Sequence, residues 1–162
     1  MAGALDGQVA VVTGGSRGIG RACAIGLARE GASVVINYTS NAAAAEETKQ
    51  ACEAAGAKVL IVKADVSKAD EAKALIEAAE KEFGKVDILV NNAGINRDRT
   101  IQRMSVEEWD TVIETDLSSI FYTTSAALGG MRERNYGRIV NMSSVIGQMG
   151  NVGQANYSAA KA

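Results

Sequence analysis

A tyrosine, a lysine and two serines near the end of the sequence are of types that act together in acid–base chemistry. Tyr157 and Lys161 are four positions apart, so on a helix they share one face and the Lys161 ammonium can lie beside the Tyr157 phenol. A neighbouring positive charge favours the phenolate, which eases proton exchange during catalysis. Ser143 and Ser144 precede this pair, and a serine hydroxyl can donate a hydrogen bond to an oxygen on which negative charge develops. The combination predicts proton transfer at a carbonyl or alcohol oxygen.

A glycine-rich turn near the start of the sequence is suited to phosphate. It reads T-G-G-S-R-G-I-G from Thr13 to Gly20 and separates a predicted strand from a predicted helix. Glycines let the backbone approach a pyrophosphate, whose charge meets free N–H groups and the positive end of the helix. The guanidinium of Arg17 suits a phosphate as well, although Arg17 can also be an ordinary surface side chain. The position of the turn predicts a dinucleotide site.

The elements that must position these residues alternate regularly along the chain. Short β-branched runs predict strands near Val9–Thr13, Ser33–Asn37, Lys58–Ala64, Val86–Asn91 and Arg138–Ser143. Amphipathic segments predict helices over Gly18–Glu30, Asn41–Ala55, Lys68–Phe83 and much of Val106–Arg132. The alternation is typical of an α/β fold, a Rossmann-like doubly wound parallel sheet with helices on both faces.

Boundary residues agree with this division of the chain. Gly31 and Gly56 stand where the first two helices should end in a residue with positive φ. Ser67 and Ser105 stand where N-caps of later helices are expected.

Length and composition restrict the class of protein. A chain of 162 residues with a formal charge of −2 predicts one domain and no nucleic-acid partner, so small molecules are favoured. Cys23 and Cys52 have no C-x-x-C spacing, so we expect reduced thiols, no metal site and a cytoplasmic location. No signal peptide or membrane span is predicted.

The glycine spacing, the segment Asn91-Asn92-Ala93-Gly94 and the Tyr-x-x-x-Lys motif together resemble the short-chain dehydrogenase/reductase family over the whole chain. The resemblance implies that Asp65 meets the adenine amino group and that Asn92 shapes the cofactor wall. Taken alone, without the resemblance, Asp65 is better interpreted as a helix-entry residue and Asn92 as a turn residue. The implied cofactor residues are Gly14, Ser16, Arg17, Gly18, Ile19, Gly20, Asn37, Asp65, Val66, Asn92, Ala93, Gly94, Tyr157 and Lys161.

The residues after the second strand predict the choice of cofactor. Enzymes that use NAD usually place Asp or Glu there to hold the adenosine ribose. Here the strand ends in Asn37 and continues as Tyr38-Thr39-Ser40, which offers no carboxylate to repel a 2′-phosphate. With Arg17 in the position where NADP-preferring relatives carry a basic residue, NADP(H) is the expected cofactor.

The resemblance also implies catalytic roles. The family places a serine thirteen positions before the tyrosine, and Ser144 meets that spacing. Ser143 is the adjacent candidate, but alternation along a strand would turn it to the opposite side. In the implied reaction a hydride passes from the nicotinamide to a ketone carbon, Tyr157 protonates the oxygen and Ser144 donates a hydrogen bond to it. Lys161 also holds the nicotinamide ribose.

Asp116 departs from the family pattern. Relatives usually carry an asparagine in a segment like Glu-Thr-Asn-Leu, where it keeps a water relay to the lysine; here the segment is Glu114-Thr115-Asp116-Leu117. An ionised aspartate accepts hydrogen bonds but cannot donate them, and its charge favours a protonated Lys161. Asp116 therefore serves as a substitute anchor, impairs turnover, or is a structural residue, and the sequence leaves all three open.

Within the family, the segments 92–98, 104–109 and 147–157 most resemble 3-oxoacyl-[acyl-carrier-protein] reductases of fatty acid synthesis and acetoacetyl-CoA reductases of polyester synthesis. A 3-oxoacyl thioester is the implied substrate, carried by CoA or by an acyl carrier protein. Arg132, Arg134 and Arg138 are either contacts for such a carrier or a solvated surface. The helices from Trp109 to Leu128 and from Tyr157 onward form subunit contacts in the family, which implies a homotetramer or homodimer.

Family members continue well past the Tyr-x-x-x-Lys motif, whereas this sequence stops at Ala162. We therefore expect a fragment that holds the named catalytic positions but lacks the last strands and the segment that covers the substrate. Two other functions remain open: a non-catalytic dinucleotide-binding module, and an NAD-dependent dehydrogenase of alcohols or sugars.

Overall fold

A computed structural model describes residues 3–162 and contains a five-stranded parallel sheet. The strands are β1 (Val9–Val12), β2 (Ser33–Tyr38), β3 (Val59–Lys63), β4 (Ile88–Asn91) and β5 (Arg138–Asn141). Their order across the sheet is β3-β2-β1-β4-β5, and each neighbouring pair is parallel. The order reverses direction beside β1, which makes the carboxyl edge of β1 and β4 the switch point where such sheets bind ligands.

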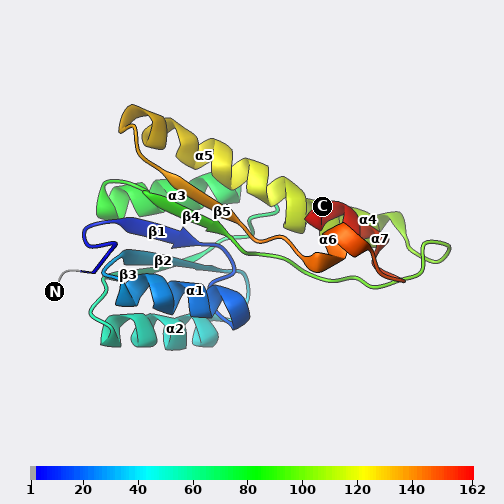
Figure 1. Ribbon diagram of the computed structural model, residues 1–162, viewed down its shortest axis with the longest axis horizontal. Helices are drawn as coiled ribbons and strands as arrows, with labels where there is room; N and C mark the ends of the chain where they lie inside the picture. The colour runs from blue at the N-terminus through cyan, green and yellow to red at the C-terminus, as the bar shows by residue number, and fades with distance from the viewer. Residues whose placement is uncertain (1–2) are drawn as a thin grey trace.

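Helices cover both faces of the sheet (Figure 1). The elements α1 (Gly18–Arg29) and α2 (Ala42–Ala54) cover one face, and α3 (Ala69–Phe83) and α5 (Ser119–Glu133) cover the other. The predicted doubly wound α/β fold is confirmed. Gly31 and Gly56 have φ of 95° and 92° where α1 and α2 end, as predicted.

Alternation along the strands builds two apolar cores. Val11, Val35 and Leu89 point to the face covered by α3 and α5, where they meet buried residues such as Leu75 and Ile76. Their neighbours along β1, β2 and β4 point to the face covered by α1 and α2. Because β1 and β2 are buried on both sides, they read as continuous apolar runs.

Beyond the carboxyl edge of the sheet lie three short helices, α4 (Val106–Ile113), α6 (Val145–Met149) and α7 (Ala155–Lys161) (Figure 1). The helix α7 packs on α6, on α4 and on a π-helical turn, η1 (Glu114–Ser118), that joins α4 to α5. This arrangement holds the last residues of the chain against the sheet edge that carries the glycine turn.

Three details differ from the sequence predictions. The helix predicted over Val106–Arg132 is divided into α4, η1 and α5. Ser67 is not an N-cap: α3 begins after Lys68, and the Ser67 hydroxyl donates to Asp65 Oδ1 at 2.7 Å. The strand β5 ends at Asn141 rather than Ser143, because the chain turns there to enter α6.

Both cysteines are free; Cys52 is buried and Cys23 is partly exposed. Among residues 3–162, no helix is long and apolar enough to cross a membrane.

Candidate active site

The glycine turn is fixed from two sides by asparagine side chains. On one side the Gly14 N–H donates to Asn37 Oδ1 at 3.2 Å, while Asn37 Nδ2 donates to the Ala64 carbonyl at 2.9 Å. On the other side Asn92 Nδ2 donates to the carbonyl oxygens of Thr13 and Gly14 at 2.9 and 3.2 Å. These bonds join β1, β2 and the segment after β4 at the switch point of the sheet.

Close packing explains two glycines of the turn. Gly14 has a φ of 61°, and a Cβ there would lie 3.0 Å from the Ala93 Cα. At Gly20 a Cβ would lie 2.5 Å from Asn92 Nδ2 and would also clash with the Gly14 carbonyl. Gly20 therefore lets α1 approach the turn.

A cavity of about 360 Å³ opens on this turn. Its walls contain every predicted cofactor residue except Gly20, Tyr157 and Lys161. The lining residues are Gly14, Ser16, Arg17, Gly18, Ile19, Asn37, Tyr38, Thr39, Ser40, Asn41, Asp65, Val66, Asn92, Ala93, Gly94, Ile95 and Thr115.

The polar side chains of this cavity differ in how many hydrogen bonds they already make within the protein. Asn37 is only 1% exposed and holds the turn, so its amide braces the backbone. Asp65 Oδ1 accepts two hydrogen bonds from Ser67, from its N–H at 3.1 Å and its hydroxyl at 2.7 Å. Arg17 is exposed and immediately precedes α1, so its guanidinium can reach a charged group in the cavity.

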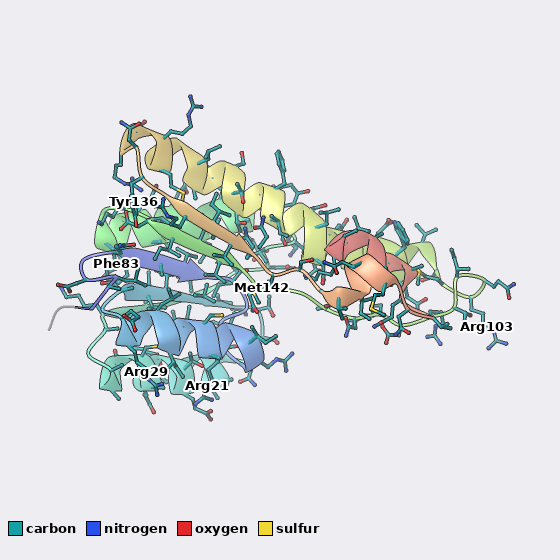
Figure 2. The ribbon with its side chains drawn as sticks, in the orientation of Figure 1. Arg21, Arg29, Phe83, Arg103, Tyr136 and Met142 are labelled. Carbon is teal, nitrogen blue, oxygen red and sulfur yellow. The ribbon has the colours of Figure 1, made fainter. Side chains whose placement is uncertain are left out.

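A second cavity of about 420 Å³ adjoins the first. The two cavities share Arg17, Ile19, Asn92, Gly94 and Ile95. The other lining residues of the second cavity are Asn96, Arg97, Asp116, Met142, Ser143, Tyr157 and Lys161. The side chain of Met142 lies where β5 leaves the sheet and the chain turns towards α6 (Figure 2).

Tyr157 and Lys161 share one face of α7, as their spacing predicts. Lys161 Nζ lies 5.8 Å from the centre of the Tyr157 ring, and the lysine is 8% exposed. The phenol and the ammonium therefore lie near each other in the second cavity, beside the residues that line both cavities.

The preceding residue, Asn156, holds this short helix in place and was not predicted from the sequence. It is fully buried, and its Nδ2 donates to the carbonyl oxygens of Arg97 and Glu108, each at 3.0 Å. Its Oδ1 accepts the Tyr157 N–H at 2.8 Å. Asn156 thus connects α7 to α4 and to the loop before α4.

The two candidate serines occupy different positions. Ser143 lines the second cavity, and its hydroxyl donates to the Lys161 carbonyl at 2.7 Å. Ser144 is the N-cap of α6, and its Oγ accepts the Ile146 N–H at 3.2 Å. Both serines lie beyond the end of β5, so strand alternation does not decide between them.

Asp116 lies at the base of the second cavity with no exposed surface. Its Oδ1 accepts the Ile95 N–H at 2.8 Å, and its Oδ2 lies 3.3 Å from Lys161 Nζ. Burial raises the pKa of the Asp116 carboxyl above its ordinary value, while the Ile95 N–H and the Lys161 charge act in the opposite direction.

Thr13 and Thr48 also build the site without having been predicted. Thr13 Oγ1 accepts the N–H groups of Asn92 and Ala93 at 2.9 and 3.0 Å. Thr48 of α2 donates to the Ser16 carbonyl at 3.0 Å. Thr13 could have been identified from its position directly before the glycine turn. Thr48 could not, because nothing in the sequence of α2 sets it apart from the other residues of that helix.

The arginines considered as carrier contacts lie at the opposite edge of the sheet, around the end of α5 and the start of β5. Arg134 Nη2 donates to the Val86 carbonyl at 2.7 Å, and Arg138 stacks on Tyr136 at 4.9 Å from the ring centre. Both side chains thus have partners within the fold.

Comparison with known proteins adds a family and several relatives. The model of the family described as short chain dehydrogenase matches residues 8–162. A 3-oxoacyl-[acyl-carrier-protein] reductase of Synechocystis sp. is 48% identical over 98% of this chain and 64% of that protein. An acetoacetyl-CoA reductase of Allochromatium vinosum is 48% identical over 96% of this chain and 63% of that protein.

A solved structure shares the fold closely. It is a protein described as a short-chain alcohol dehydrogenase from Sinorhizobium meliloti 1021, with a TM-score of 0.93 and 34% identity over 97% of this chain and 62% of that chain. This chain thus spans less than two thirds of the length of these relatives, between 62% and 64%.

Proposed function

Since the chain belongs to the short-chain dehydrogenase family, we propose that it acts in the NADPH-dependent reduction of a 3-oxoacyl thioester to the 3-hydroxyacyl thioester. The observation that carries the proposal is the pair of adjoining cavities. One contains the glycine turn, the other contains Tyr157 and Lys161, and the wall between them is shared. A dinucleotide that lies along the first cavity therefore brings its reactive end to the second.

The residues of the first cavity fit a dinucleotide phosphate. Gly18 has a φ of 56°, and apart from its chain neighbours and the backbone of its own helix, no atom of the described residues lies within 4 Å of the position of a Cβ there. The turn thus presents bare backbone at the start of α1, where N–H groups and the helix dipole favour an anion.

The same cavity supports NADP(H) rather than NAD(H). The segment from Asn37 to Asn41 that lines it contains no carboxylate. The Asn37 amide is already engaged with Gly14 and Ala64. Arg17 supplies a guanidinium at the same opening, and a guanidinium suits a 2′-phosphate.

In the second cavity the side chains of this chain supply the proton that the substrate oxygen gains. The bound cofactor supplies the hydride. Tyr157 donates its proton to the carbonyl oxygen of the substrate, and a serine hydroxyl donates a hydrogen bond to the same oxygen. Lys161 keeps a positive charge near the phenol and holds the ribose of the cofactor.

The names of the relatives support the substrate class, because 3-oxoacyl-[acyl-carrier-protein] and acetoacetyl-CoA are both 3-oxoacyl thioesters. The description of the solved relative as an alcohol dehydrogenase favours a second candidate, the oxidation of an alcohol with NAD.

The test is a titration with NADPH and with NADH that follows nicotinamide fluorescence, alongside turnover of acetoacetyl-CoA. We expect tighter binding of NADPH, and we expect Arg17→Gln to weaken NADPH binding by about tenfold, roughly 1.4 kcal/mol, while sparing NADH. Arg21→Gln is the matched control, because Arg21 lies on the same helix but pairs with Glu47 at 3.3 Å; its side chain is shown in Figure 2.

Each alternative has its own outcome. Tighter binding of NADH would support the NAD-dependent alcohol dehydrogenase. Tight NADPH binding without turnover of any 3-oxoacyl thioester would support the non-catalytic dinucleotide-binding module.

A further inference from the structure

The π-helical turn η1 aims a carboxylate at the candidate active site. Asp116 is the middle residue of this turn and has no exposed surface. A π-turn inside an α-helix is rare and is frequently found at functional sites. Here it separates α4 from α5 and faces α7, which carries Tyr157 and Lys161.

The surroundings of Asp116 accommodate a charge. Its Oδ1 receives the Ile95 N–H at 2.8 Å. A Cβ at Gly94 would lie 2.7 Å from its Oδ2, so the glycine leaves room for the carboxylate. Among residues 3–162 no hydrogen-bond donor is well aligned with Oδ2, and the Lys161 ammonium, 3.3 Å away, is its charge partner.

Other charged groups on the elements packed against Asp116 are directed elsewhere. On α4, Glu108 binds Arg99 at 3.1 Å, and Glu107 and Asp110 are exposed. On η1 itself, Glu114 is exposed. The charged side chains of α5, Arg132 and Glu133, are at its far end.

The loop and helix that complete the cavity contribute few other charges. From the loop after β4, Arg97 lines the cavity, and its Nη1 donates to the Asn96 carbonyl at 2.9 Å. On α7 the titratable groups are Tyr157 and Lys161. Lys161 is therefore the charged side chain that reaches the Asp116 carboxylate.

A carboxylate in this position changes the electrostatics of the pair. A lone Lys161 ammonium near the phenol pulls the phenol towards its ionised form. With an anion 3.3 Å from the ammonium, the two charges largely cancel at the distance of the Tyr157 ring. The phenol then keeps its proton over a wider range of pH.

We propose that Asp116 is a positioning residue that anchors Lys161 and compensates its charge, so that Tyr157 stays in its proton-donating form over a wider range of pH. The proposal rests on the function proposed above. In reduction the carbonyl carbon gains a hydride from the reduced cofactor, and its oxygen gains the Tyr157 proton. In oxidation the hydride returns to the oxidised cofactor, and the Tyr157 phenolate takes the proton of the alcohol.

The first test measures the pH dependence of both directions in the wild type and in Asp116→Asn. The amide removes the negative charge, so the basic limb of the profile for reduction should move to lower pH by about one unit. The acidic limb of the profile for oxidation, which needs the Tyr157 phenolate, should move to lower pH by a similar amount. Glu114→Gln, a matched change at an exposed position of the same turn, should leave both profiles unchanged. Profiles of Asp116→Asn that coincide with the wild type would overturn the proposal.

The second test does not need turnover, so it separates this proposal from the proposed function. Carbon-13 NMR of the aspartate carboxyls, with Asp116 assigned from Asp116→Asn, follows its ionisation in the wild type and in Lys161→Met. Loss of the ammonium should move the Asp116 titration to higher pH, because the carboxylate loses its charge partner. Lys161→Gln serves as a second variant if Lys161→Met does not fold. An unchanged titration in a folded variant would exclude the charge pair.

Discussion

At the scale of single residues, the position of the candidate catalytic tyrosine depends on an asparagine. Asn156 is the second residue of α7 and directly precedes Tyr157. Asn156 supplies three hydrogen bonds, two to α4 and the loop before it and one to the Tyr157 N–H. Since it is fully buried, these bonds are shielded from water and hold the Tyr157 phenol in the cavity.

Replacing Tyr157 with Phe removes the proton donor and keeps the ring. We expect turnover to fall by at least about 100-fold, the usual contribution of general acid catalysis. Binding of NADPH should change little, because the ring still fills the same place. Steady-state kinetics and a fluorescence titration measure the two effects, and near-normal turnover would exclude Tyr157 as the acid.

The hydrogen bonds of the two hydroxyl groups distinguish the roles of Ser143 and Ser144. The Ser143 hydroxyl donates a hydrogen bond to the Lys161 carbonyl. Ser144 Oγ accepts a hydrogen bond from the Ile146 N–H, so its own O–H stays free to donate to a substrate oxygen. We therefore expect Ser144→Ala to lower kcat by about 100-fold, similar to the loss of an oxyanion donor. Ser143→Ala should cost less turnover, and its main effect should be on stability. The reverse order in parallel kinetic and denaturation measurements would assign the role to Ser143.

At the scale of elements, the start of α4 is stabilised by its N-cap residue, Ser105. Ser105 Oγ accepts the Glu108 N–H at 3.0 Å, and Glu108 Oε2 accepts the Ser105 N–H at 3.0 Å, which completes a capping box. The capping box orients the first turn of α4, which carries the Glu108 carbonyl that accepts a hydrogen bond from Asn156 Nδ2.

Ser105→Ala removes one half of this capping box. The free energy of unfolding should fall by about 1 kcal/mol, as for other N-cap serines. Ser105→Asp keeps an oxygen that can accept the same N–H and should restore most of the loss. Urea denaturation of the three proteins measures both effects, and equal stability of the alanine and aspartate variants would show that the cap contributes nothing.

The other half of the capping box predicts a dependence on pH. The hydrogen bond from the Ser105 N–H lowers the pKa of the Glu108 carboxyl, and the Arg99 guanidinium makes a smaller contribution in the same direction. The folded protein therefore binds this proton more weakly than the unfolded chain does. The stabilisation by Glu108 should be present above the ordinary glutamate pKa of roughly 4.3 and should be lost as the pH falls through the lower value in the fold. The difference in stability between the wild type and Glu108→Gln, measured against pH, should shrink in that range.

The elements also show what a sequence can predict. The roles of Gly31, Gly56 and Ser105 could be predicted, because few residue types suit a helix end with positive φ or an N-cap. Ser67 was misleading: its hydroxyl bonds to Asp65, two residues earlier, and the helix starts after Lys68. The turn η1 was not predicted, because no glycine or proline between Val106 and Leu128 marks a break in the helix.

At the scale of the whole molecule, the five strands, their parallel arrangement and most of the residues that line the first cavity could be named from the sequence. They depend on local patterns, which are alternating apolar runs and a glycine turn between a strand and a helix. The second cavity depends instead on contacts between distant segments. The packing of Asn156 on α4 and the approach of Asp116 to Lys161 join residues 45 or more positions apart, and no local pattern in one sequence records them.

The outer face of η1 and α5 predicts how copies of the chain associate. Leu117, Phe121 and Leu128 are 45%, 69% and 42% exposed, and their spacing places them along one side of the helix. An apolar stripe of this kind is typical of an interface between proteins. Phe121→Glu places a charge in the middle of the stripe and should shift the protein towards the monomer in sedimentation velocity. Ile101→Glu, at a position that is 74% exposed but away from the stripe, should leave the assembly unchanged. If both variants sediment like the wild type, copies do not associate through this stripe.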